Sequence, residues 1–578
     1  MTMIPDDELE DRIRASLTRW ADDAPVSVDR ADELDRHRRA RLRPRVLIAA
    51  AAAVAVIAYV GAVLPRDDGT PTVAGPGSSI QRIAVGKATG VRTLVADGQA
   101  LWLMSTNDGV LYRIDPRTDR VVATHDVGTG YEGMAAGDGL VWLAGYGPPR
   151  VVAVDQDTGA VVHEINLDGD PWGVTLAFGA AWIGGAGGLV RVDPTTGVAT
   201  THELGFSTGF LAASADALWV ADPEGTRLAQ IDPRSGVVDG FADGGDHPRS
   251  VAVAPEGDVW VTLPDADEVV RIDATTRKVT ARVSTGRWPN TIAFVGDDAW
   301  VSDFHDGTIT RIDRRDARVV AMYPAGNRPG AVVSAFGRVW VSLHQEASVL
   351  AIDPHGALLE VPPATFAQTI TVDGRNVELR CRGEGRSTVV LVQDVWYDAG
   401  AVPTLEALLA ARTRVCIAGP EDRVDRAEQL APDLRAALER ARIPGPFVVV
   451  GFGYGGLVAR ELASTLDGVE ATVLVDENTL PPSDRGTMSP FMRSVAEWFD
   501  KTDGLGVDVP TVVVTSDPDV ATDDPRVGDG DTRRQFHANQ LALADRLGAK
   551  VVVDTGDPWP PTYRPAALVS VILERVNR

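Results

Sequence analysis

Between residues 79 and 363, short apolar stretches alternate with polar residues at a period of two. The segment from Ser250 to Val283, SVAVAPEGDVWVTLPDADEVVRIDATTRKVTARV, contains four such stretches separated by turn residues. This alternation predicts strands that bury one face. One tryptophan marks each repeat, with gaps of 40, 40, 37, 41, 40 and 40 residues: Trp102, Trp142, Trp182, Trp219, Trp260, Trp300 and Trp340.

A second marker follows each tryptophan, mostly 13 residues later, in phrases such as RIDPRT and QIDPRSG. Four strands in about 40 residues make one propeller blade, so the region predicts an all-β seven-bladed propeller over 79–363. The tryptophans should pack between blades. The second markers should cap turns through their side chains; they are Asp115, Asp155, Asp193, Asp232, Asp273, Asp313 and Asp353.

A strand-like segment, Ile80 to Val85, precedes the first repeat. An open ring would leave two unpaired strand edges, so we expect this segment to pair into the last blade. The phrases HPRS, WPNT and RPGA each precede the first strand of a blade. They should line one mouth of the central channel, which is the expected binding surface.

After Pro363 the pattern changes to strands that alternate with longer helical segments, which predicts an α/β domain over 364–578 with a mainly parallel sheet. Helices are expected over 402–411, 427–442, 457–465, 532–547 and 564–576. Strands are expected over 369–372, 377–381, 388–393, 414–418, 447–451, 471–476, 511–515 and 550–554.

The N-terminal part contains a charge-free run of 19 residues, Val46 to Leu64. A helix of this length covers roughly the 30 Å hydrocarbon core, so the run predicts a transmembrane helix. Residues 36–45 hold six arginines, which orient the tail 1–45 toward the cytoplasm. A cleaved signal peptide is the alternative, but the charged region before the run is too long for one. Residues 65–78, rich in Gly, Pro, Ser and Thr, predict a flexible stalk.

The formal net charge of -25 argues against a nucleic-acid partner, because phosphate binding needs clustered Lys and Arg. The chain has two cysteines, too few for a disulfide framework or a cysteine-ligated metal site. We therefore expect no cofactor and no metal. The membrane is the one expected partner besides an unknown protein or small-molecule ligand outside it.

The repeat region resembles the YVTN and NHL-like propellers and, more loosely, the virginiamycin B lyase-like propellers. The lyase-like members use histidines near the central channel. That resemblance makes His247, His305 and His344 candidate ligand residues on the channel face. Their contexts differ (DHPRS, DFHDG and SLHQE), which favours ordinary loop histidines.

In the C-terminal region, Gly451-Phe452-Gly453-Tyr454-Gly455-Gly456 follows the apolar run FVVV and precedes a helical pattern. A strand, a tight glycine turn and a helix are the setting of a nucleophile elbow. With GEGRSTVVLV, TRVCIAGPED and ATVLVDEN, this stretch resembles the α/β-hydrolase family over the whole of 364–578.

The resemblance carried over by position puts Gly453 at the nucleophile, Asp517 or Asp519 at the acid, and Asp557 at the histidine. Two of the three catalytic side chains are then absent. Gln393 and Asp394 stand where the family usually has His-Gly, and Tyr454 follows the nucleophile position in the oxyanion region. The strand order of the family also makes a disulfide between Cys381 and Cys416 plausible, with two buried thiols as the alternative.

Three features could restore chemistry. His537 is the one histidine of 364–578, but it lies far in sequence from the expected loop. Asp517 or Asp519 could act with Asp557 as paired carboxylates. The loop DPDVATDDPRVGDGD could hold calcium, although it lacks the spacing of an EF-hand and a solvated loop is favoured.

The sequence thus favours a single-pass membrane protein that displays a propeller and a catalytically inactive hydrolase-like domain outside the membrane, with a role in binding or scaffolding. One alternative is an active hydrolase of esters, lactones or cell-envelope substrates that uses displaced residues. A weaker alternative is a lyase centred on the propeller.

Overall fold

The structure is a computed structural model in which most of the chain after residue 78 is described. The described ranges are 79–85, 90–344, 346–392, 402–420, 429–453, 455–475, 509–516, 547–554 and 565–576, with residues 537, 540, 541 and 543–545. No helix among them is long and apolar enough to cross a membrane. The expected transmembrane helix, Val46–Leu64, lies outside these residues.

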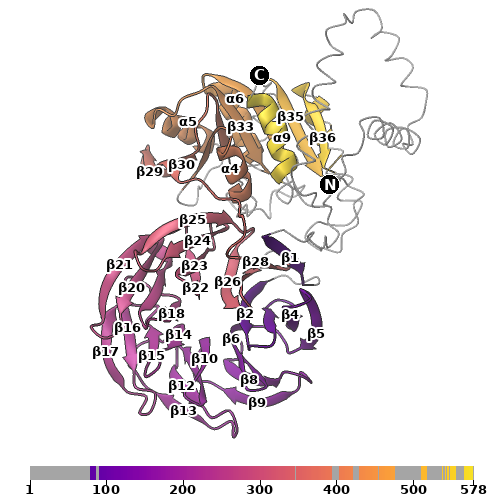
Figure 1. Cartoon of the computed structure of the whole chain (residues 1–578). Helices are drawn as coiled ribbons and strands as arrows, with labels where there is room; N and C mark the ends of the chain where they lie inside the picture. The colour runs from indigo at the N-terminus through magenta and orange to yellow at the C-terminus, as the bar shows by residue number, and fades with distance from the viewer. Residues whose placement is uncertain are drawn as a thin grey trace, which may run out of the picture. The chain divides into compact units, whose positions relative to one another are not determined.

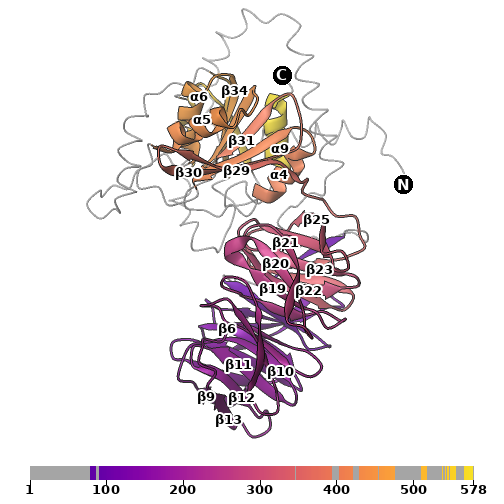
Figure 2. The ribbon, with the colours of Figure 1, turned by 90° about the vertical axis from the view of Figure 1, so that its left-hand side faces the viewer.

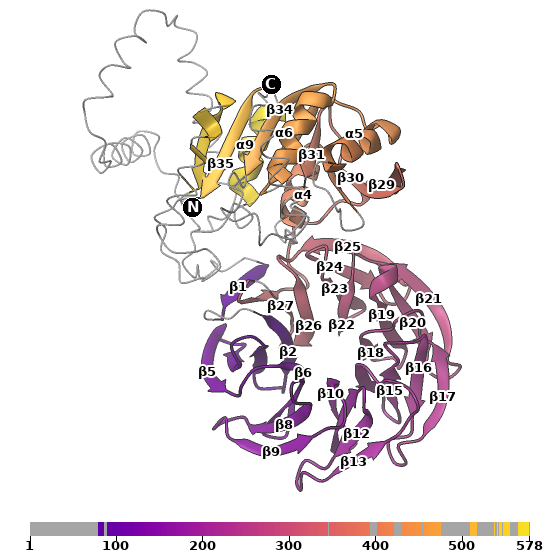
Figure 3. The same ribbon diagram turned by 180° about the vertical axis from the view of Figure 1, so that it is seen from behind.

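Seven four-stranded antiparallel sheets follow one another around a ring (Figure 1). Figure 3 shows the ring from behind, with the first strand of each blade innermost. The predicted seven-bladed all-β propeller is confirmed. The first four blades contain β2 (Val91–Ala96), β3 (Leu101–Ser105), β4 (Val110–Asp115) and β5 (Arg120–Asp126); β6 (Tyr131–Gly137), β7 (Leu140–Gly145), β8 (Arg150–Asp155) and β9 (Val161–Asn166); β10 (Pro171–Ala177), β11 (Ala180–Gly185), β12 (Gly188–Val192) and β13 (Ala199–His202); β14 (Leu211–Ala213), β15 (Leu218–Ala221), β16 (Arg227–Ile231) and β17 (Val238–Asp243).

The last three blades have the same plan. They contain β18 (Val251–Val253), β19 (Val259–Leu263), the 3-10 helix η1 (Pro264–Ala266), β20 (Glu268–Asp273) and β21 (Lys278–Ser284); β22 (Pro289–Val295), β23 (Asp298–Asp303), β24 (Thr308–Asp313) and β25 (Arg318–Pro324); β26 (Pro329–Ala335), β27 (Arg338–Leu343), β28 (Ser348–Ile352) and β1 (Ile80–Ala84).

The ring closes as the sequence predicts. Strand β1 pairs antiparallel with β28, with Ile80 opposite Ile352 and Ala84 opposite Ser348. It is the outermost strand of the last blade, whose other strands come from the far end of the repeat region. The ring therefore has no open edge at this junction.

Each repeat tryptophan fills the space between its own blade and the next. Trp260 packs with Ile292, Ala299 and Val301 of the following blade, and Trp340 packs with Leu94 and Leu101 of the first blade. All seven indoles are at most 1% exposed. The predicted packing role is confirmed, and the tryptophans are the largest side chains of these inter-blade cores.

The seven turn aspartates cap their own turns, also as predicted. In each, the carboxylate accepts a hydrogen bond from a backbone N–H two or three residues later, as from Arg117 to Asp115 at 2.9 Å and from Thr276 to Asp273 at 2.6 Å. These backbone hydrogen bonds favour the ionised form, and they are the first cause that lowers the pKa of Asp115 and Asp273.

The C-terminal region is one eight-stranded sheet in the order β29-β30-β32-β31-β33-β34-β35-β36. All pairs from β32 through β31 to β36 are parallel, whereas β29 and β30 pair antiparallel. The strands are β29 (Ala364–Val372), β30 (Arg375–Arg382), β31 (Thr388–Val392), β32 (Arg414–Pro420), β33 (Phe447–Phe452), β34 (Val469–Val475), β35 (Thr511–Ser516) and β36 (Lys550–Asp554).

Helices cover both faces of this sheet (Figure 2). On one face, α5 (Leu430–Arg440) and α6 (Gly455–Thr465) pack with Val390, Cys416 and Val449. On the other, α4 (Val402–Ala410) and α9 (Pro565–Val576) pack with Val389, Val448 and Val473. Successive residues of β31 and β33 thus point to opposite cores, which explains their unbroken apolar runs. A disulfide joins Cys381 to Cys416, which lie opposite each other on β30 and β32.

Candidate functional site

One end of the inner strands is held by backbone hydrogen bonds between two sets of loops. The loop that enters each inner strand meets the turn between the second and third strands. Tyr146 N–H donates to Gly130 O at 3.0 Å, and His344 N–H donates to Arg328 O at 3.0 Å. Both sets of loops therefore present their side chains at the same end of the ring.

Bulges shape this end. In five blades the register between the inner strand and its neighbour shifts at the second residue of the inner strand. A bulge re-aims a side chain that would otherwise follow the alternation of the strand. The second residues of these five strands are Arg92, Glu132, Trp172, Asn290 and Gly330.

Charged groups gather around one aromatic ring here. The guanidinium carbons of Arg92 and Arg328 lie 5.7 Å and 5.4 Å from the centre of the Phe304 ring. The imidazole of His344 lies 5.9 Å from the same ring, and Arg92 Nη1 pairs with Glu132 Oε1 at 2.9 Å. We call Arg92, Glu132, Arg249, Phe304, Arg328 and His344 the inner-strand cluster.

The guanidinium of Arg249 contacts neutral groups. Its Nε donates to Asn290 Oδ1 at 2.9 Å, and its guanidinium lies 5.5 Å from the Phe210 ring. Among the residues that the structure describes, no carboxylate forms an ion pair with it. Burial, assisted by the positive charge of Arg92, lowers the pKa of Arg249 to about 10. Arg249 is nevertheless a cation at neutral pH.

His344 is neutral at the same pH. Burial, and then the charges of Arg92 and Arg328, lower its pKa to about 4. Its Nδ1 is buried and has no hydrogen-bond partner within the described part of the chain. A neutral imidazole with an open nitrogen can accept or donate one hydrogen bond to a ligand.

The three candidate histidines are not equivalent. His305 stacks on Trp288, with ring centres 4.9 Å apart, and also lies against Phe304 at 5.6 Å. His305 and His344 therefore share one aromatic neighbour. His247 is more than half exposed and pairs instead with Asp265, whose Oδ2 is 2.6 Å from its Nδ1.

Two carboxylates that flank Phe304 in the sequence have opposite environments. Asp303 is fully buried and accepts hydrogen bonds from Thr308 and Thr310 at 2.9 Å and 2.6 Å. Burial raises its pKa to about 8. Asp306 is also buried, but the charges of Arg380 and Arg287 outweigh the cost of burial and hold its pKa far below the usual range.

Asp306 belongs to a chain of ion pairs that continues into the C-terminal region. It pairs with Arg287 at 2.8 Å and with Arg380 of β30 at 3.0 Å. Arg380 and Arg382 both reach Glu406 of α4, at 3.5 Å and 2.9 Å. Arg287 also pairs with Glu378 at 3.1 Å. These ion pairs are not visible in the sequence, because their members are spread over 119 residues, from Arg287 to Glu406.

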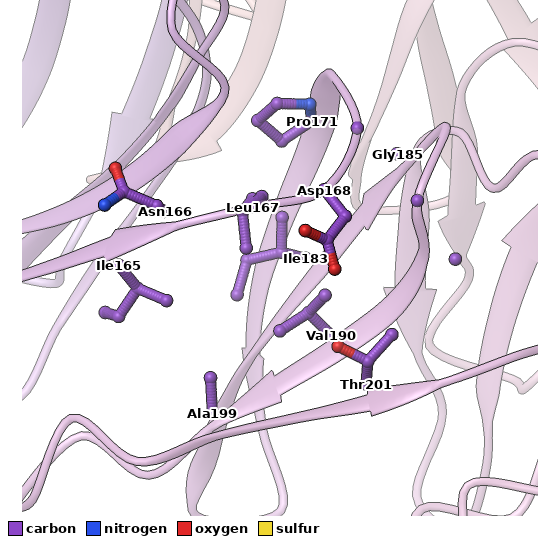
Figure 4. Close-up of a pocket in the computed structure, with 13 residues that line it drawn as sticks. Ile165, Asn166, Leu167, Asp168, Pro171, Ile183, Gly185, Val190, Ala199 and Thr201 are labelled. Atoms are coloured by element: carbon purple, nitrogen blue, oxygen red, sulfur yellow. The ribbon is translucent and has the colours of Figure 1, made fainter.

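A separate small pocket lies beside the third blade (Figure 4). Its empty volume of about 430 Å³ includes open solvent. Two residues connect β11 to β12, whereas four connect β3 to β4 and β7 to β8. This shorter turn, with Gly185, Gly187 and Gly188, leaves the space open next to Asp168 and Pro171. Its lining is mostly backbone and aliphatic groups.

In the C-terminal region, the junction of strand, glycine turn and helix is present at Gly453. The residue has a φ of 53°, and its N–H donates to Val475 O at 3.0 Å. A side chain on Gly451 would lie 2.4 Å from Gly455 O, so the turn is too tight for one. A strand, a tight glycine turn and a helix therefore meet at Gly453, which contributes no side chain.

The other positions carried over from the hydrolase family are outside the described residues. These are Gln393, Asp394, Tyr454, Asp517, Asp519 and Asp557, together with the acidic loop after Ser516. His537 is described, and its Nδ1 lies 3.4 Å from Thr515 Oγ1 at the end of β35. No group of three or more metal-ligating side chains occurs among the described residues.

Three of the six cluster residues, Arg249, Arg328 and His344, belong to the segments or candidates that the sequence singles out, and the other three were missed. HPRS and WPNT contain Arg249 and Asn290, and RPGA begins with Arg328. Arg92 and Glu132 lie 10 residues before Trp102 and Trp142, so the repeat phase could have found them. Nothing local in the sequence marks Phe304.

A family model described as "SGL: SMP-30/Gluconolactonase/LRE-like region" matches residues 185–375. No curated protein matches the chain. Among solved structures, virginiamycin B lyase from Staphylococcus aureus is 16% identical, covering 47% of this chain and 98% of that chain with a TM-score of 0.40. Hydrazine synthase from Kuenenia stuttgartiensis is 14% identical, covering 47% and 97% with a TM-score of 0.42. The chain thus contains an SMP-30/gluconolactonase-like region, which begins in the propeller and ends at the start of β30, and its seven-bladed propeller is similar to virginiamycin B lyase.

Proposed function

We propose that this chain is a binding protein, in which the propeller holds a ligand at the inner-strand cluster and the C-terminal region is an inactive α/β-hydrolase-like domain. The observation that carries the proposal is Gly453. A nucleophile elbow works by presenting a hydroxyl or thiol on a strained turn, and this turn presents none. Without a nucleophile, neither covalent catalysis nor a triad can operate there.

The strand order supports the hydrolase-like assignment. The sheet has two antiparallel strands at one edge, followed by six parallel strands with β32 placed before β31. That order, with helices on both faces, is the one implied by the family resemblance of residues 364–578. Asp557 stands where the hydrolase family has its catalytic histidine, and a carboxylate is a much weaker base than the imidazole of histidine.

The proposal also places the two domains outside the membrane, anchored by Val46–Leu64. The disulfide between Cys381 and Cys416 supports this location, because disulfides persist in oxidising compartments and are rare in the cytosol. Protease treatment of intact cells is expected to remove the C-terminal domain and spare the N-terminal tail. The opposite pattern would contradict the orientation.

A fluorophosphonate probe tests the inactive-domain claim on the full chain in neutral detergent. We expect no covalent label within 364–578 and no turnover of p-nitrophenyl esters, with a known serine esterase as the positive control. A labelled serine in this region would favour the alternative, an active hydrolase that uses displaced residues. Gly453→Ser should stay inactive, because Asp557 still occupies the place of the histidine.

A lyase centred on the propeller is the second candidate, and one observation favours it. His344 is neutral at pH 7, and its buried Nδ1 has no hydrogen-bond partner among the described residues, so it can accept a proton from a bound substrate. Quinupristin, which a solved structure contains with virginiamycin B lyase, is a suitable probe. Ring opening that is lost in His344→Ala would favour the lyase, whereas intact quinupristin would favour binding alone.

A further inference from the structure

We propose that the inner-strand cluster binds a small anion, through a carboxylate or phosphate group that pairs with Arg249 and Arg92. This inference rests on the proposed binding function and adds the chemical class of the ligand. Three features of the cluster support it: a local excess of positive charge, the lack of a carboxylate partner for Arg249 among the described residues, and the fixed positions of the cations.

The charge of the cluster is opposite to that of the chain. The whole chain has a net charge of -25, but the cluster places two guanidinium groups, those of Arg92 and Arg249, near the carboxylate of Glu132, with His344 neutral. In an acidic protein, a local excess of positive charge at one end of a ring attracts anions and repels cations. Salt screens partly buried charges poorly, so this local attraction persists at physiological ionic strength.

Arg249 provides the direct argument. A buried cation is costly unless a charged partner compensates it. The side chain of Arg249 donates a hydrogen bond to the neutral side chain of Asn290, and it forms no ion pair with a carboxylate among the described residues. Its two terminal amino groups form the fork that matches a carboxylate or phosphate in two parallel hydrogen bonds.

The other cations are held in place before any ligand arrives. Glu132 fixes one side of Arg92 at 2.9 Å, and the Phe304 ring lies under the guanidinium groups of Arg92 and Arg328. Phe304 is 6% exposed, so it acts as a support for the arginines and offers little surface to a ligand. Preorganised cations lose little side-chain entropy on binding.

The negative charge of Glu132 can be removed by substitution, which gives a test of anion binding. It is about one-third exposed, and its charge acts on both Arg249 and Tyr146. Removing that charge raises the net positive charge of the cluster without removing a cation. The amide oxygen of the glutamine can still accept the hydrogen bond from Arg92 Nη1. Glu132→Gln should therefore strengthen anion binding, a gain that a misfolded protein would not show.

Isothermal titration of the full chain in neutral detergent tests the inference with benzoate, inorganic phosphate and benzylammonium as probes. We expect at least one anion to bind at millimolar concentration or better, and benzylammonium not to bind. Arg249→Gln should weaken anion binding at least about tenfold, since a charge-assisted hydrogen bond is lost. Arg315→Gln, which removes an exposed arginine elsewhere on the propeller, is the control and should change nothing. Glu132→Gln should bind severalfold more tightly.

Two results would overturn the inference. One is binding of benzylammonium that matches or exceeds the anions, with no effect of Arg249→Gln; the cluster would then bind ligands of another class, and the proposed binding function would stand. The other is that neither anion, at a concentration of about 10 mM, binds to the original chain or to the Glu132→Gln variant. The dissociation constant would then be well above the millimolar value that the inference expects. Fluorophosphonate labelling reports on the proposed function independently of both.

Discussion

The repeat tryptophans stabilise the propeller by packing, and some of them also by hydrogen bonding. The seven tryptophans are equally buried, but their indole N–H groups are not equally satisfied. Trp102 donates to Asp97 at 2.8 Å, whereas the indole nitrogen of Trp260 is buried without a partner in the described structure. An unmade buried hydrogen bond costs about 1–3 kcal/mol. The same repeat position therefore makes unequal contributions to stability.

Tryptophan-to-phenylalanine substitutions should reveal this inequality. Both Trp102→Phe and Trp260→Phe leave a cavity of similar size. The first also removes the indole donor to Asp97 Oδ2, whereas the second removes a donor that has no partner in the described structure. We expect Trp102→Phe to reduce the free energy of unfolding by about 1–2 kcal/mol more than Trp260→Phe. Urea denaturation measures the difference, and equal losses would contradict the account.

Asp303 should make the stability of the propeller depend on pH. The pKa of the Asp303 carboxyl is about 8 in the folded chain and near 3.8 in the unfolded chain. At a pH between these two values, Asp303 is protonated in the folded chain and ionised in the unfolded chain. This contribution to stability therefore falls as the pH rises from about 4 to 8. Asp303→Asn should raise Tm more at pH 8.5 than at pH 5, as measured by calorimetry. A pH-independent effect would show that the carboxyl is ionised when folded.

At the scale of elements, closure of the ring depends on one strand that is 264 residues from its partner. Arg82 of β1 forms an ion pair with Glu346 beside the last blade, and Ile83 packs into the core shared by the last and first blades. The sequence predicts this strand because alternation and an otherwise open edge are both visible in it. The elbow in the C-terminal sheet was predictable for a similar reason, since tight glycine turns are local.

Ile83→Asp tests ring closure. It places a charge in an inter-blade core where Ile83 is 5% exposed, so we expect a loss of about 3 kcal/mol or more. Val122→Asp on the outermost strand β5 is the matched control, because Val122 is 55% exposed. Limited proteolysis should detect cleavage near residue 80 in the first variant alone. Equal resistance of both variants would mean that β1 does not seal the ring.

The inner-strand cluster was less predictable than the strands that carry it. Arg92, Phe304 and His344 meet although they belong to different blades, and sequence periodicity does not report which side chains converge across a ring. The bulges that re-aim Arg92 and Glu132 depend on register shifts, which leave no mark in the alternation. Local signals thus predicted the blades, turns and elbow, whereas the site required the three-dimensional structure.

For the whole molecule, the ion pairs from Arg287 through Asp306 and Arg380 to Glu406 join the propeller to β30 and α4. Each member is at least partly withdrawn from water, and Asp306 and Glu406 are buried. Buried ion pairs of this kind add little to the free energy of unfolding, because burying the charges costs about as much as their attraction returns. Removing one partner is costly, because it leaves the other charges buried and uncompensated.

Asp306→Asn should accordingly lower the free energy of unfolding by about 3 kcal/mol. The substitution leaves Arg287 and Arg380 facing a neutral side chain in a buried place. Asp297→Asn is the control, because Asp297 pairs with the exposed Arg315 and should cost under about 0.5 kcal/mol. Chemical denaturation followed by tryptophan fluorescence measures both. A cost for Asp306→Asn as small as the control would show that the chain contributes no stability.

The central proposal is that the propeller, and not the glycine turn at Gly453, holds the ligand. Hydrogen–deuterium exchange of the full chain, with and without benzoate at saturating concentration, tests it directly. The account predicts slower exchange in peptides that contain Arg92, Arg249 and His344, and unchanged exchange over residues 447–465. Protection confined to residues 447–465 would contradict it, because the glycine turn at Gly453 would then be the binding site.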